Sequence, residues 1–406
     1  MEYSAVMETR LKKIWKWMAG EGISLLMLED CEARRDQNIR WLTGHPGDAL
    51  LILSSGNPSK TDQVSANQER NLRPLEPAET APAGGLCEQA VLVAWDINLA
   101  KLYTRAPVFL ASYSDFDRQP RKAIAAAAQR FGIPAGSKIE IPSVTPYPVF
   151  LDYVGELTDY DILCRENGAG AEIQKLRAVK DREEIDIIRK AVNITNELID
   201  LLEKNIRGGK IKTEADAALF IEVEARRRDC EGTSFGTLAA GPSRSFAIHA
   251  FPGWTCAPFA GQGFSILDFG VKYAGYCTDV TLTITRDLNP KQEKLSGLVE
   301  KASKLAISMA HNGTSAKEIA AAVDAFFARS KKQMPHGLGH GIGLQEHEYP
   351  VIRNSTNNEW VLEPGMVFTI EPGLYDPILG GCRLEHDILM TETGAEVLTA
   401  SRIIRL

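Results

Sequence analysis

FSILDFGVKYAGYCTDVTLTITR, residues 264–286, consists of two apolar, β-branched runs joined by a short segment that contains glycine. Each run carries one aspartate, Asp268 or Asp279, among residues that favour buried strands. A turn centred on Tyr273 and Ala274 would form a β-hairpin in which the two aspartates are direct cross-strand neighbours. Such side chains lie about 5 Å apart, so two buried carboxylates repel unless a proton or a cation lies between them. In the alternative, the register is shifted and one aspartate lies in a surface turn.

The helices and strands around this hairpin follow an order that occurs twice. Two amphipathic helices precede the hairpin, the first over about 181–206 and the second from Thr213. Two more helices follow it, opened by Asn289-Pro290 and by Ser315, and then a second pair of strands, MVFTIEP and CRLEHDILMT. Two helices and a hairpin, repeated, predict an α+β domain with an internal duplication.

The second pair of strands also carries carboxylates among apolar residues. Glu371 lies in the first strand and Glu385 in the second, and pairing about position 378 would set them opposite each other. Two such hairpins in one duplicated domain would place four acids around a single site. Four carboxylates and one imidazole suit two divalent cations, because the four negative charges balance two doubly charged ions.

The imidazole is supplied by a glycine-rich stretch, MPHGLGHGIGLQEHE (334–348), which holds three of the chain's seven histidines. His336 and His340 have the spacing of the two ligands on an HExxH zinc helix. A helix is disfavoured here, because each interior glycine costs about 1 kcal/mol against alanine and glycine occupies every second position from 337 to 343. These glycines are typical of an extended segment that approaches its neighbours closely. The segment is predicted to bring His340 to the acids.

The first 165 residues alternate helical and strand patterns, which predicts a layered α/β domain. Strands are predicted for NIRWLTG, ALLILS, AVLVAW and KIEI, and helices for about 8–20 and for RKAIAAAAQRFG. A stretch rich in Ser, Pro and Glu over 55–86 is predicted to be a surface loop, either an idle insertion or a segment that closes the far end of the site. The turn-rich segment RENGAGAE separates this domain, 1–168, from the C-terminal domain, 169–406.

Length and composition bound the class of protein. A chain of 406 residues is expected to form two or three domains, and 44% hydrophobic with 24% charged residues is typical of a soluble globular protein. A formal charge of −7 argues against a nucleic-acid surface, and no apolar run reaches the ~18 residues of a membrane span. Seven scattered cysteines without a CxxC pair, and an N-terminus without a signal peptide, favour a reduced, cytoplasmic protein.

The segments LDFGVKYAGYCTDVTLT, HGLGHGIGLQEHE, FTIEPG and RLEHD, in this order, resemble the metal-binding segments of the pita-bread metallopeptidases. That family includes aminopeptidase P, Xaa-Pro dipeptidase (prolidase), methionine aminopeptidase and the metal-free creatinases. The N-terminal half resembles the creatinase/prolidase N-terminal domain, so the resemblance covers nearly the whole chain. It implies a pita-bread catalytic domain with a pseudo-twofold duplication, preceded by an α/β domain of the creatinase type.

Carried over position by position, the resemblance implies five metal ligands. They are Asp268, Asp279, His340, Glu371 and Glu385. Asp279 and Glu385 would bridge two divalent metal ions, and a water or hydroxide between the metals would be the nucleophile. Glu371 matches the residue that acts as general base in this family. Ligation rich in oxygen favours Mn²⁺, with Co²⁺, Zn²⁺ and Fe²⁺ as alternatives.

Three further residues have counterparts near the substrate in this family. His347 matches a histidine that contacts the substrate and the tetrahedral intermediate, and His249 matches one that lies over the substrate from the opposite side. Arg383 matches an arginine that helps to hold the ligands. The sequence departs from the family pattern at Glu346 and at His386, neither of which is a predicted ligand. Both departures bear on substrate preference.

The resemblance implies a dinuclear metallopeptidase that removes or releases an N-terminal residue ahead of proline. Xaa-Pro dipeptidase and aminopeptidase P activities are both compatible with the sequence, so the expected substrate is a short proline-containing peptide or dipeptide. A hydrolase or lyase acting on a non-peptide small molecule is the alternative. A binding protein without activity is disfavoured, because all five ligand positions hold metal-binding residues. Relatives are usually dimers or tetramers, which implies a homodimer here.

Overall fold

The computed structural model describes residues 2–55, 76–77 and 89–406, so most of the predicted loop 55–86 lies outside the described residues. The chain forms two compact units, Met1–Gln174 and Lys175–Leu406. The domain limits predicted from the sequence, 168 and 169, stay a prediction. Six cysteines in the described part of the chain are free thiols. Among the described helices, none combines the length and the apolar character that crossing a membrane requires.

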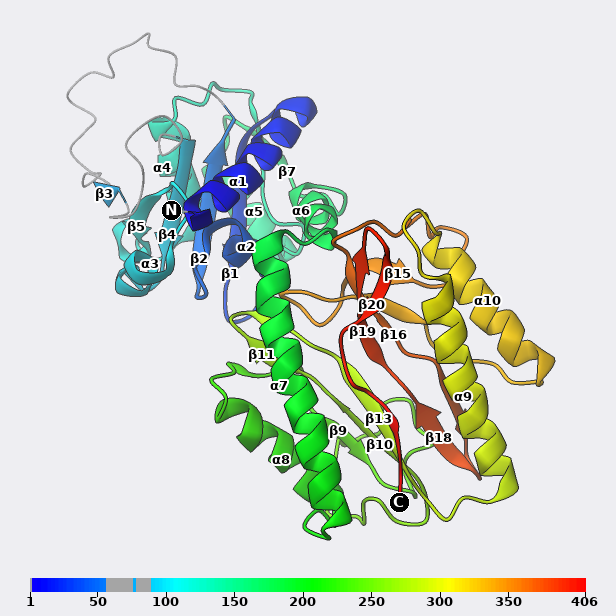
Figure 1. The fold of residues 1–406 in the computed structure, drawn as a ribbon. Helices are drawn as coiled ribbons and strands as arrows, with labels where there is room; N and C mark the ends of the chain where they lie inside the picture. The colour runs from blue at the N-terminus through cyan, green and yellow to red at the C-terminus, as the bar shows by residue number, and fades with distance from the viewer. Residues whose placement is uncertain (1, 56–75, 78–88) are drawn as a thin grey trace. The chain divides into compact units, whose positions relative to one another are not determined.

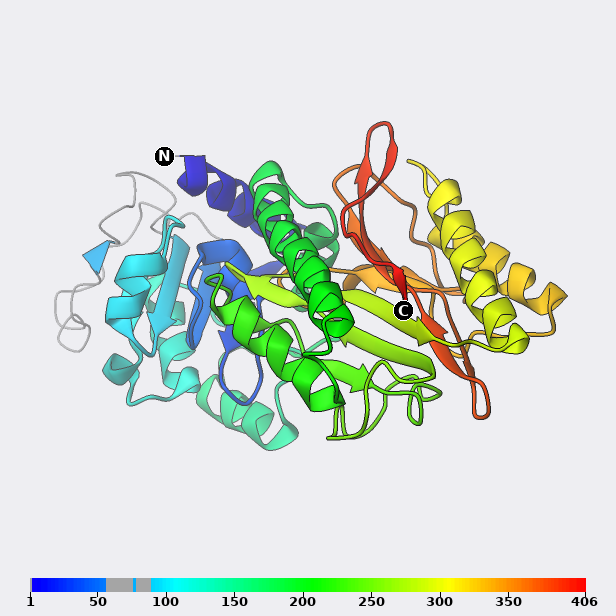
Figure 2. The ribbon, with the colours of Figure 1, turned by 60° about the horizontal axis from the view of Figure 1, so that its bottom comes forward.

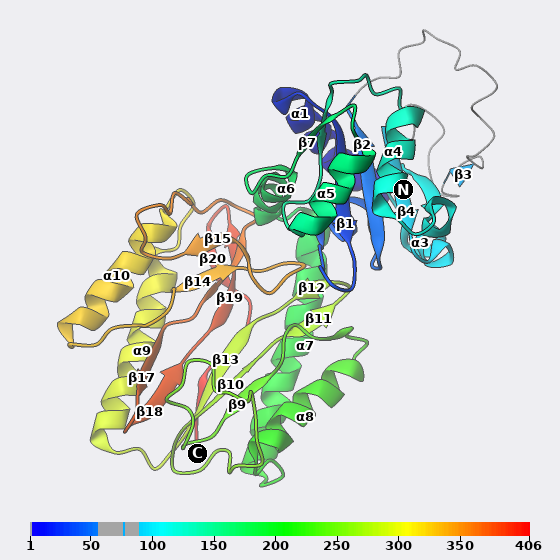
Figure 3. The same cartoon turned by 180° about the vertical axis from the view of Figure 1, so that it is seen from behind.

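The N-terminal unit is a seven-stranded sheet in the described residues, with the order β3-β5-β4-β2-β1-β6-β7. Its strands are β1 (Ile23–Asp30), β2 (Ala49–Ser54), β3 (Glu76–Pro77), β4 (Ala90–Ala94), β5 (Phe109–Ser112), β6 (Lys138–Glu140) and β7 (Asp161–Leu163). Its helices are α1 (Glu2–Glu21), α2 (Asn38–Thr43), α3 (Ile97–Tyr103), the 3₁₀ helix η3 (Tyr113–Phe116), α4 (Pro120–Arg130) and α5 (Tyr147–Glu156), and α6 (Ala169–Ala178) crosses into the next unit. Helix α1 covers one face of the sheet (Figure 1), and α4 and α5 cover the other (Figure 3). The predicted α/β layering is confirmed.

The prediction of a strand for NIRWLTG is wrong, because this segment forms helix α2. Ile39 and Leu42 are both buried, as they would be on one face of a helix, but so is Trp41. An apolar run this short fits a buried strand equally well, so periodicity alone does not separate the two structures. Gly44 favours the helix because it provides its C-terminal cap. Its φ is positive, 82°, and its backbone N–H donates to the carbonyl of Arg40.

The C-terminal unit repeats the order of two helices followed by paired strands, as predicted. The first half contains α7 (Arg182–Arg207), α8 (Glu214–Arg226), β10 (Gly263–Phe269) and β13 (Val280–Arg286). The second half contains α9 (Pro290–Met309), α10 (Ala316–Arg329), β16 (Val367–Ile370) and β19 (His386–Thr391). The residue before the second helix makes an equivalent bridge in each half, Thr213 to Pro258 and Ser315 to Val361. The internal duplication is therefore present in the structure.

Shorter strands complete the sheets of this unit. They are β8 (Gly232–Thr233), β9 (Leu238–Ala240), β11 (Val271–Tyr273), β12 (Tyr276–Cys277), β14 (Gly339–Gly341), β15 (Glu348–Ile352), β17 (Gly373–Asp376), β18 (Gly380–Arg383), β20 (Gly394–Val397) and β21 (Ile403–Arg405). The two larger sheets run β21-β13-β10-β9 and β15-β14-β16-β19-β20. Figure 2 shows the strands between two helix pairs, α7 with α8 on one side and α9 with α10 on the other. Each helix pair packs an apolar core against the strands of its own half.

The register of the first hairpin differs from the prediction. β10 pairs with β13 so that Asp268 lies opposite Thr281, and the direct pairing of Asp268 with Asp279 is wrong. The turn falls on Ala274 and Gly275, which both have positive φ, 47° and 90°. Positive φ at both central residues suits a two-residue hairpin turn. Because a shift of two residues preserves the face of each strand, the expectation that the two aspartates share one face stays a prediction.

The register of the second hairpin agrees with the prediction. Strands β16 and β19 pair Ile370 with His386, and β17 and β18 pair Gly373 with Arg383. Both pairings are centred on position 378, so Glu371 and Glu385 face each other where the ladder is interrupted between them.

Candidate metal centre

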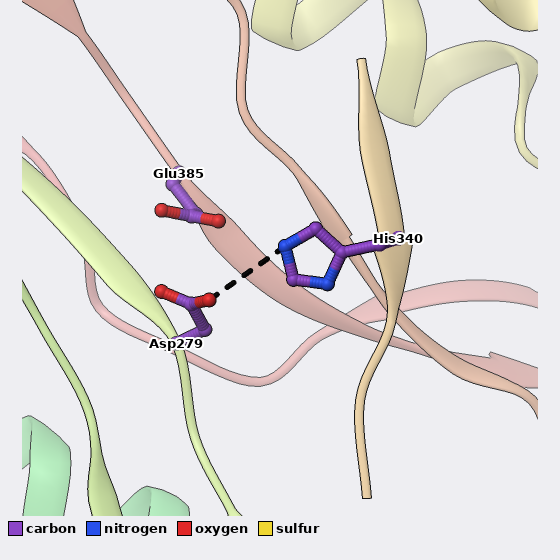
Figure 4. A group of neighbouring side chains, drawn as sticks. All are labelled: Asp279, His340 and Glu385. Atoms are coloured by element: carbon purple, nitrogen blue, oxygen red, sulfur yellow. Dashed lines mark ion pairs between the residues drawn. The ribbon is translucent and has the colours of Figure 1, made fainter. Parts of the chain in front are cut away.

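Asp279, His340 and Glu385 bring their side-chain donor atoms together, all within 4.8 Å of one another. Asp279 immediately precedes β13, His340 lies on β14, and Glu385 immediately precedes β19. Figure 4 shows the three side chains pointing toward one another from these separate strands. The Nε2 atom of His340 lies 3.7 Å from Oδ2 of Asp279. Both halves of the duplicated unit therefore contribute to one cluster.

The glycines around His340 allow close packing, as the sequence predicts. A Cβ atom on Gly339 would lie 2.0 Å from the carbonyl oxygen of Thr369, and one on Gly341 would lie 1.9 Å from the carbonyl oxygen of Tyr349. Any larger residue at either position would push β14 away from its neighbours. The segment is extended rather than helical, which confirms the interpretation of the glycine pattern.

His340 is held by its own strand, β14, and by the neighbouring strand, β16. Its backbone N–H donates to Oγ1 of Thr369 at 3.2 Å, and ring Nδ1 lies 3.1 Å from the carbonyl oxygen of Gly341. When Nδ1 carries the proton and donates to that carbonyl, Nε2 keeps a lone pair that faces the acids. Burial and the nearby His347 lower the pKa of His340 to about 4, so the ring is neutral at physiological pH. A neutral imidazole with a free Nε2 is the form that binds metals.

Glu371 lies beside this cluster. Its Oε1 is 3.7 Å from Nε2 of His340, and its Oε2 is 3.7 Å from Nδ1 of His336. Its backbone N–H donates to the carbonyl of Leu338 at 2.8 Å, which ties the residue to the start of the histidine segment.

Asp268 is held by the buried guanidinium of Arg383. Nη2 of Arg383 donates to Oδ2 of Asp268 at 2.6 Å, while Nε donates to Thr281 and Nη1 to Tyr375. The other carboxylate oxygen of Asp268, Oδ1, is buried and has no hydrogen-bond partner among the described residues. A buried carboxylate oxygen without a partner is costly, so this atom is suited to a cation.

Burial and mutual repulsion disfavour ionisation of the acids. Burial raises the pKa of Asp279 and of Glu371 well above the ordinary range, and the charge of Glu385 adds to both shifts. Burial and the charge of Asp268 raise the pKa of Glu385 to about 7. These are the shifts expected of carboxylates whose compensating charge is a bound cation. Four acids, one neutral imidazole and an unpartnered Oδ1 therefore fit divalent metal ions.

Three residues that the sequence analysis missed support the cluster. Oδ2 of Asp387 accepts the backbone N–H of Asp279 at 3.2 Å. The hydroxyl of Thr281 donates to Oε2 of Glu385 at 2.7 Å, and the hydroxyl of Tyr375 bonds to Nε2 of His336 at 3.1 Å. Asp387 could have been found, because it is an acid within an apolar strand, the same signal that identified the predicted ligands.

The predicted substrate-side residues are placed differently from one another. The ring of His347 lies against that of His340, with centroids 4.0 Å apart and the ring planes tilted by 38°. His249 is exposed on the loop after β9, and its ring is not part of the donor cluster formed by the described residues. The preceding residue, Ile248, accepts a hydrogen bond from Nη1 of Arg383 at 3.0 Å. Arg383 thus contacts both Asp268 and the loop that carries His249.

Residues 186–392, just over half of the chain, match the model of metallopeptidase family M24. The chain belongs to metallopeptidase family M24. All five predicted ligands lie within the matched residues, and M24 membership implies divalent metal ions.

Two curated proteins are similar to the C-terminal part of the chain. The putative dipeptidase YkvY of Bacillus subtilis is 34% identical over 230 residues, which cover 56% of this chain and 62% of the relative. The Xaa-Pro dipeptidase of Pyrococcus furiosus is 36% identical over 234 residues, which cover 56% of this chain and 64% of the relative. Each alignment therefore spans less than two thirds of the relative's length.

Solved structures resemble nearly the whole chain. The prolidase from Pyrococcus horikoshii OT3 has a TM-score of 0.75 at 24% identity and covers 97% of this chain and 99% of its own. The X-Pro aminopeptidase from Thermotoga maritima MSB8 has a TM-score of 0.73 at 23% identity and covers 94% of this chain and 98% of its own. This similarity shows the fold. The M24 chain has a pita-bread C-terminal domain preceded by an α/β domain, as the sequence predicts.

Proposed function

We propose that this M24 chain is a metal-dependent peptidase that hydrolyses the bond between an N-terminal residue and a following proline. The observation that carries the proposal is the convergence of Asp279, His340 and Glu385, with donor atoms within 4.8 Å of one another, beside Glu371. The similarity to the Xaa-Pro dipeptidase of P. furiosus supports the choice of substrate.

Five residues would hold two divalent cations, with Mn²⁺ favoured over Co²⁺, Zn²⁺ and Fe²⁺ by the oxygen-rich donor set. They are Asp268, Asp279, His340, Glu371 and Glu385. When bound, the cations would lower the pKa of a water molecule and polarise the carbonyl of the scissile bond.

The side chains around the donors supply the remaining chemistry. Glu371 is the candidate general base, because its carboxylate lies between His340 and His336, 3.7 Å from each ring. It would accept the proton of the attacking water and pass it to the leaving nitrogen of proline. His347, beside His340, is exposed and would contact the substrate and the negative charge that develops on its carbonyl oxygen. Arg383 would keep Asp268 and the His249 loop in one fixed arrangement.

The experiment that tests this function is hydrolysis of Ala-Pro and Ala-Pro-Ala by protein stripped of metal and refilled with Mn²⁺. Elemental analysis of the same samples counts the bound ions, and Ala-Ala is the control peptide without proline. Cleavage of Ala-Pro alone is expected of an Xaa-Pro dipeptidase, and cleavage of Ala-Pro-Ala after the first alanine is expected of an aminopeptidase P. About two bound metals without cleavage of either peptide would contradict the proposed substrate but would still support the assignment of the metal centre.

A homodimer and a cytoplasmic location are part of the same proposal. Light scattering coupled to size exclusion measures the first and cell fractionation the second. A monomer that is fully active would contradict the expected dimer without affecting the assignment of the site.

A further inference from the structure

Four buried charged residues form a cluster next to segment 343–348, which carries His347. It consists of Arg177, Lys180, Glu184 and Glu348. Arg177 is 2% exposed, Lys180 4% and Glu184 3%, and the side chain of Glu348 is 4% exposed. Two positive and two negative groups balance, which offsets part of the cost of burial. None of these residues belongs to the metal donors, so the proposed chemistry does not explain the cluster.

The carboxylate of Glu348 is the centre of this cluster. Its Oε1 pairs with Nη2 of Arg177 and accepts the backbone N–H of Gln345 at 3.0 Å. Its Oε2 lies 3.3 Å from Nζ of Lys180. A Cβ atom on Gly343 would lie 2.5 Å from the same Oε2, so only glycine leaves room for the carboxylate there. Glu348 therefore stabilises the bent segment 343–348 through contacts of its carboxylate with residues of that same segment.

The same segment is joined to the strand that leads to Asp279. The backbone N–H of Cys277 on β12 donates to the carbonyl of Gly343 at 2.7 Å. The neighbouring Tyr276 donates its hydroxyl to Oε1 of Glu184 at 2.9 Å. Within the charged cluster, Glu348 thus contacts the histidine segment and Glu184 contacts β12, the strand that leads to Asp279.

His347 immediately precedes Glu348 in the chain. The side chain of His347 is exposed, yet its ring lies against that of His340, with centroids 4.0 Å apart. An exposed side chain holds such a position only when its backbone is fixed. We propose that Glu348, anchored by Arg177 and Lys180, is the positioning residue that fixes His347 beside His340. Its catalytic consequence rests on the role of His347 in the proposed function, whereas the positioning itself does not.

The positioning is tested without catalysis in metal-free protein labelled with ¹³C in its histidine rings. The seven histidines give separate ring signals, and His347→Asn identifies the signal of His347. Glu348→Gln is expected to shift and broaden the signals of His347 and His340 while those of His45 and His311 stay in place. Glu396→Gln is the matched control, because it breaks an exposed ion pair with Arg189 in the same unit. An unchanged His347 signal in Glu348→Gln, or equal shifts of all histidines, would overturn the proposal.

A double-mutant cycle tests the catalytic consequence in Mn²⁺-loaded protein. Displacement of a catalytic group by about 1 Å can cost up to about 100-fold in rate, so Glu348→Gln is expected to lower kcat/KM by 10- to 100-fold with the metal content unchanged. In a His347→Asn background, Glu348→Gln is expected to cause no further loss. Losses that multiply would show that Glu348 acts independently of His347 and would overturn the proposal. If no variant and no wild-type protein cleaves a proline peptide, the proposed function fails while the histidine signals still decide the positioning.

A second variant covers the case in which Glu348→Gln does not fold. Gly343→Ala keeps all four charged groups and adds one methyl group at the position now occupied by the Glu348 carboxylate. It is expected to shift the same two histidine signals and to lower kcat/KM through His347. Wild-type signals and wild-type kinetics in Gly343→Ala would contradict the proposed anchoring.

Discussion

Asp279 links the two halves of the candidate centre at the scale of a single residue. Its carboxylate faces His340 from the second half, and its backbone N–H is held by Asp387, also from the second half. We expect Asp279→Asn to reduce bound metal to below one ion per chain and to abolish hydrolysis, because a neutral amide is a far weaker ligand for a divalent cation. Elemental analysis and circular dichroism of the same sample separate metal loss from unfolding.

The control for this substitution is Asp200→Asn. Asp200 is an exposed aspartate in the same unit whose ion pair with Arg402 lies on the surface. Full metal content in Asp279→Asn, or equal loss in Asp200→Asn, would contradict the assignment of Asp279 as a ligand.

The second prediction for a single residue concerns Arg383. Its buried guanidinium is the partner of Asp268, and its removal leaves that carboxylate unpaired. Breaking a buried ion pair typically costs about 3–5 kcal/mol, so Arg383→Met is expected to lower the free energy of unfolding of metal-free protein by that amount. Urea titration measures it, and Arg402→Met, which removes only surface pairs, is expected to cost less than about 1 kcal/mol. Equal costs in the two variants would show that the pair with Asp268 does not stabilise the fold.

The sequence predicted which residues lie at the site better than it predicted the hydrogen-bond partners of these residues. Asp268 and Glu385 stand out because an acid within an apolar strand is unfavourable without compensation. The bond from Thr281 to Glu385, by contrast, joins residues far apart in the chain, and nothing local to either residue predicts it. Tyr375 was missed for the same reason, since a tyrosine in a strand is unremarkable until His336 and Arg383 are placed beside it.

At the scale of elements, hairpin register depends on the turn more than on the strands. The second hairpin follows the predicted register, whereas the first is shifted by two residues because its turn uses Ala274 and Gly275. A two-residue shift preserves the face of each strand, so the expectation that Asp268 and Asp279 lie on one side stays a prediction. Alternation of side chains was readable from the sequence, but the exact position of the turn was not.

The prediction at the scale of elements concerns Glu214, the first residue of helix α8. The side chain of Glu214 is buried and accepts hydrogen bonds from the backbone N–H groups of Gly241 at 2.7 Å and Thr255 at 2.8 Å. It also pairs with Arg244. These bonds fix the loop that carries His249, so Glu214→Gln is expected to weaken that loop. Hydrogen bonds to a charged group contribute about 1.5–3 kcal/mol, which corresponds to amide exchange at Gly241 and Thr255 that is roughly 10- to 100-fold faster.

Hydrogen exchange resolved by mass spectrometry measures this effect. Glu222→Gln on the same helix is the control, because Glu222 is partly exposed and pairs with Arg226 rather than with the loop. Unchanged exchange across 241–255 in Glu214→Gln would show that the loop is held by other contacts.

At the scale of the whole molecule, the duplication could be predicted because the helices and strands repeat in order along the chain. The repeat survives in bridges that no sequence pattern shows, Thr213 with Pro258 and Ser315 with Val361. The N-terminal unit was less readable, since the short apolar run NIRWLTG fits a strand as well as the helix that it forms. Short elements take their structure from the surrounding fold, and such context is absent from a local pattern.

The buried carboxyl groups of the candidate metal centre lead to a prediction for the stability of the whole chain. The pKa of Glu385 is raised to about 7, and those of Asp279 and Glu371 lie well above the ordinary range of an unfolded chain. Between about pH 4.5 and 7 these three acids therefore bind more protons in the folded protein without metal than in the unfolded chain, whereas His336 and His340, whose pKa values are lowered to about 4, bind fewer up to about pH 6.5. The contribution of the three acids to the free energy of unfolding is then expected to fall as the pH rises through this window, by about 1.4 kcal/mol for each unit of pKa difference. Below pH 4.5 this contribution is fully present.

Divalent cations are expected to reverse the trend, because they supply the charge that ionised carboxylates need and bind the folded state alone. Urea unfolding at pH 5, 6, 7 and 8, with metal-free protein and with excess Mn²⁺, measures both arms. Stabilisation by Mn²⁺ should grow with pH, and Glu385→Gln, which cannot ionise, should give metal-free protein a shallower dependence. The same dependence on pH in wild-type and Glu385→Gln metal-free protein between pH 5 and 8 would contradict the raised pKa of Glu385.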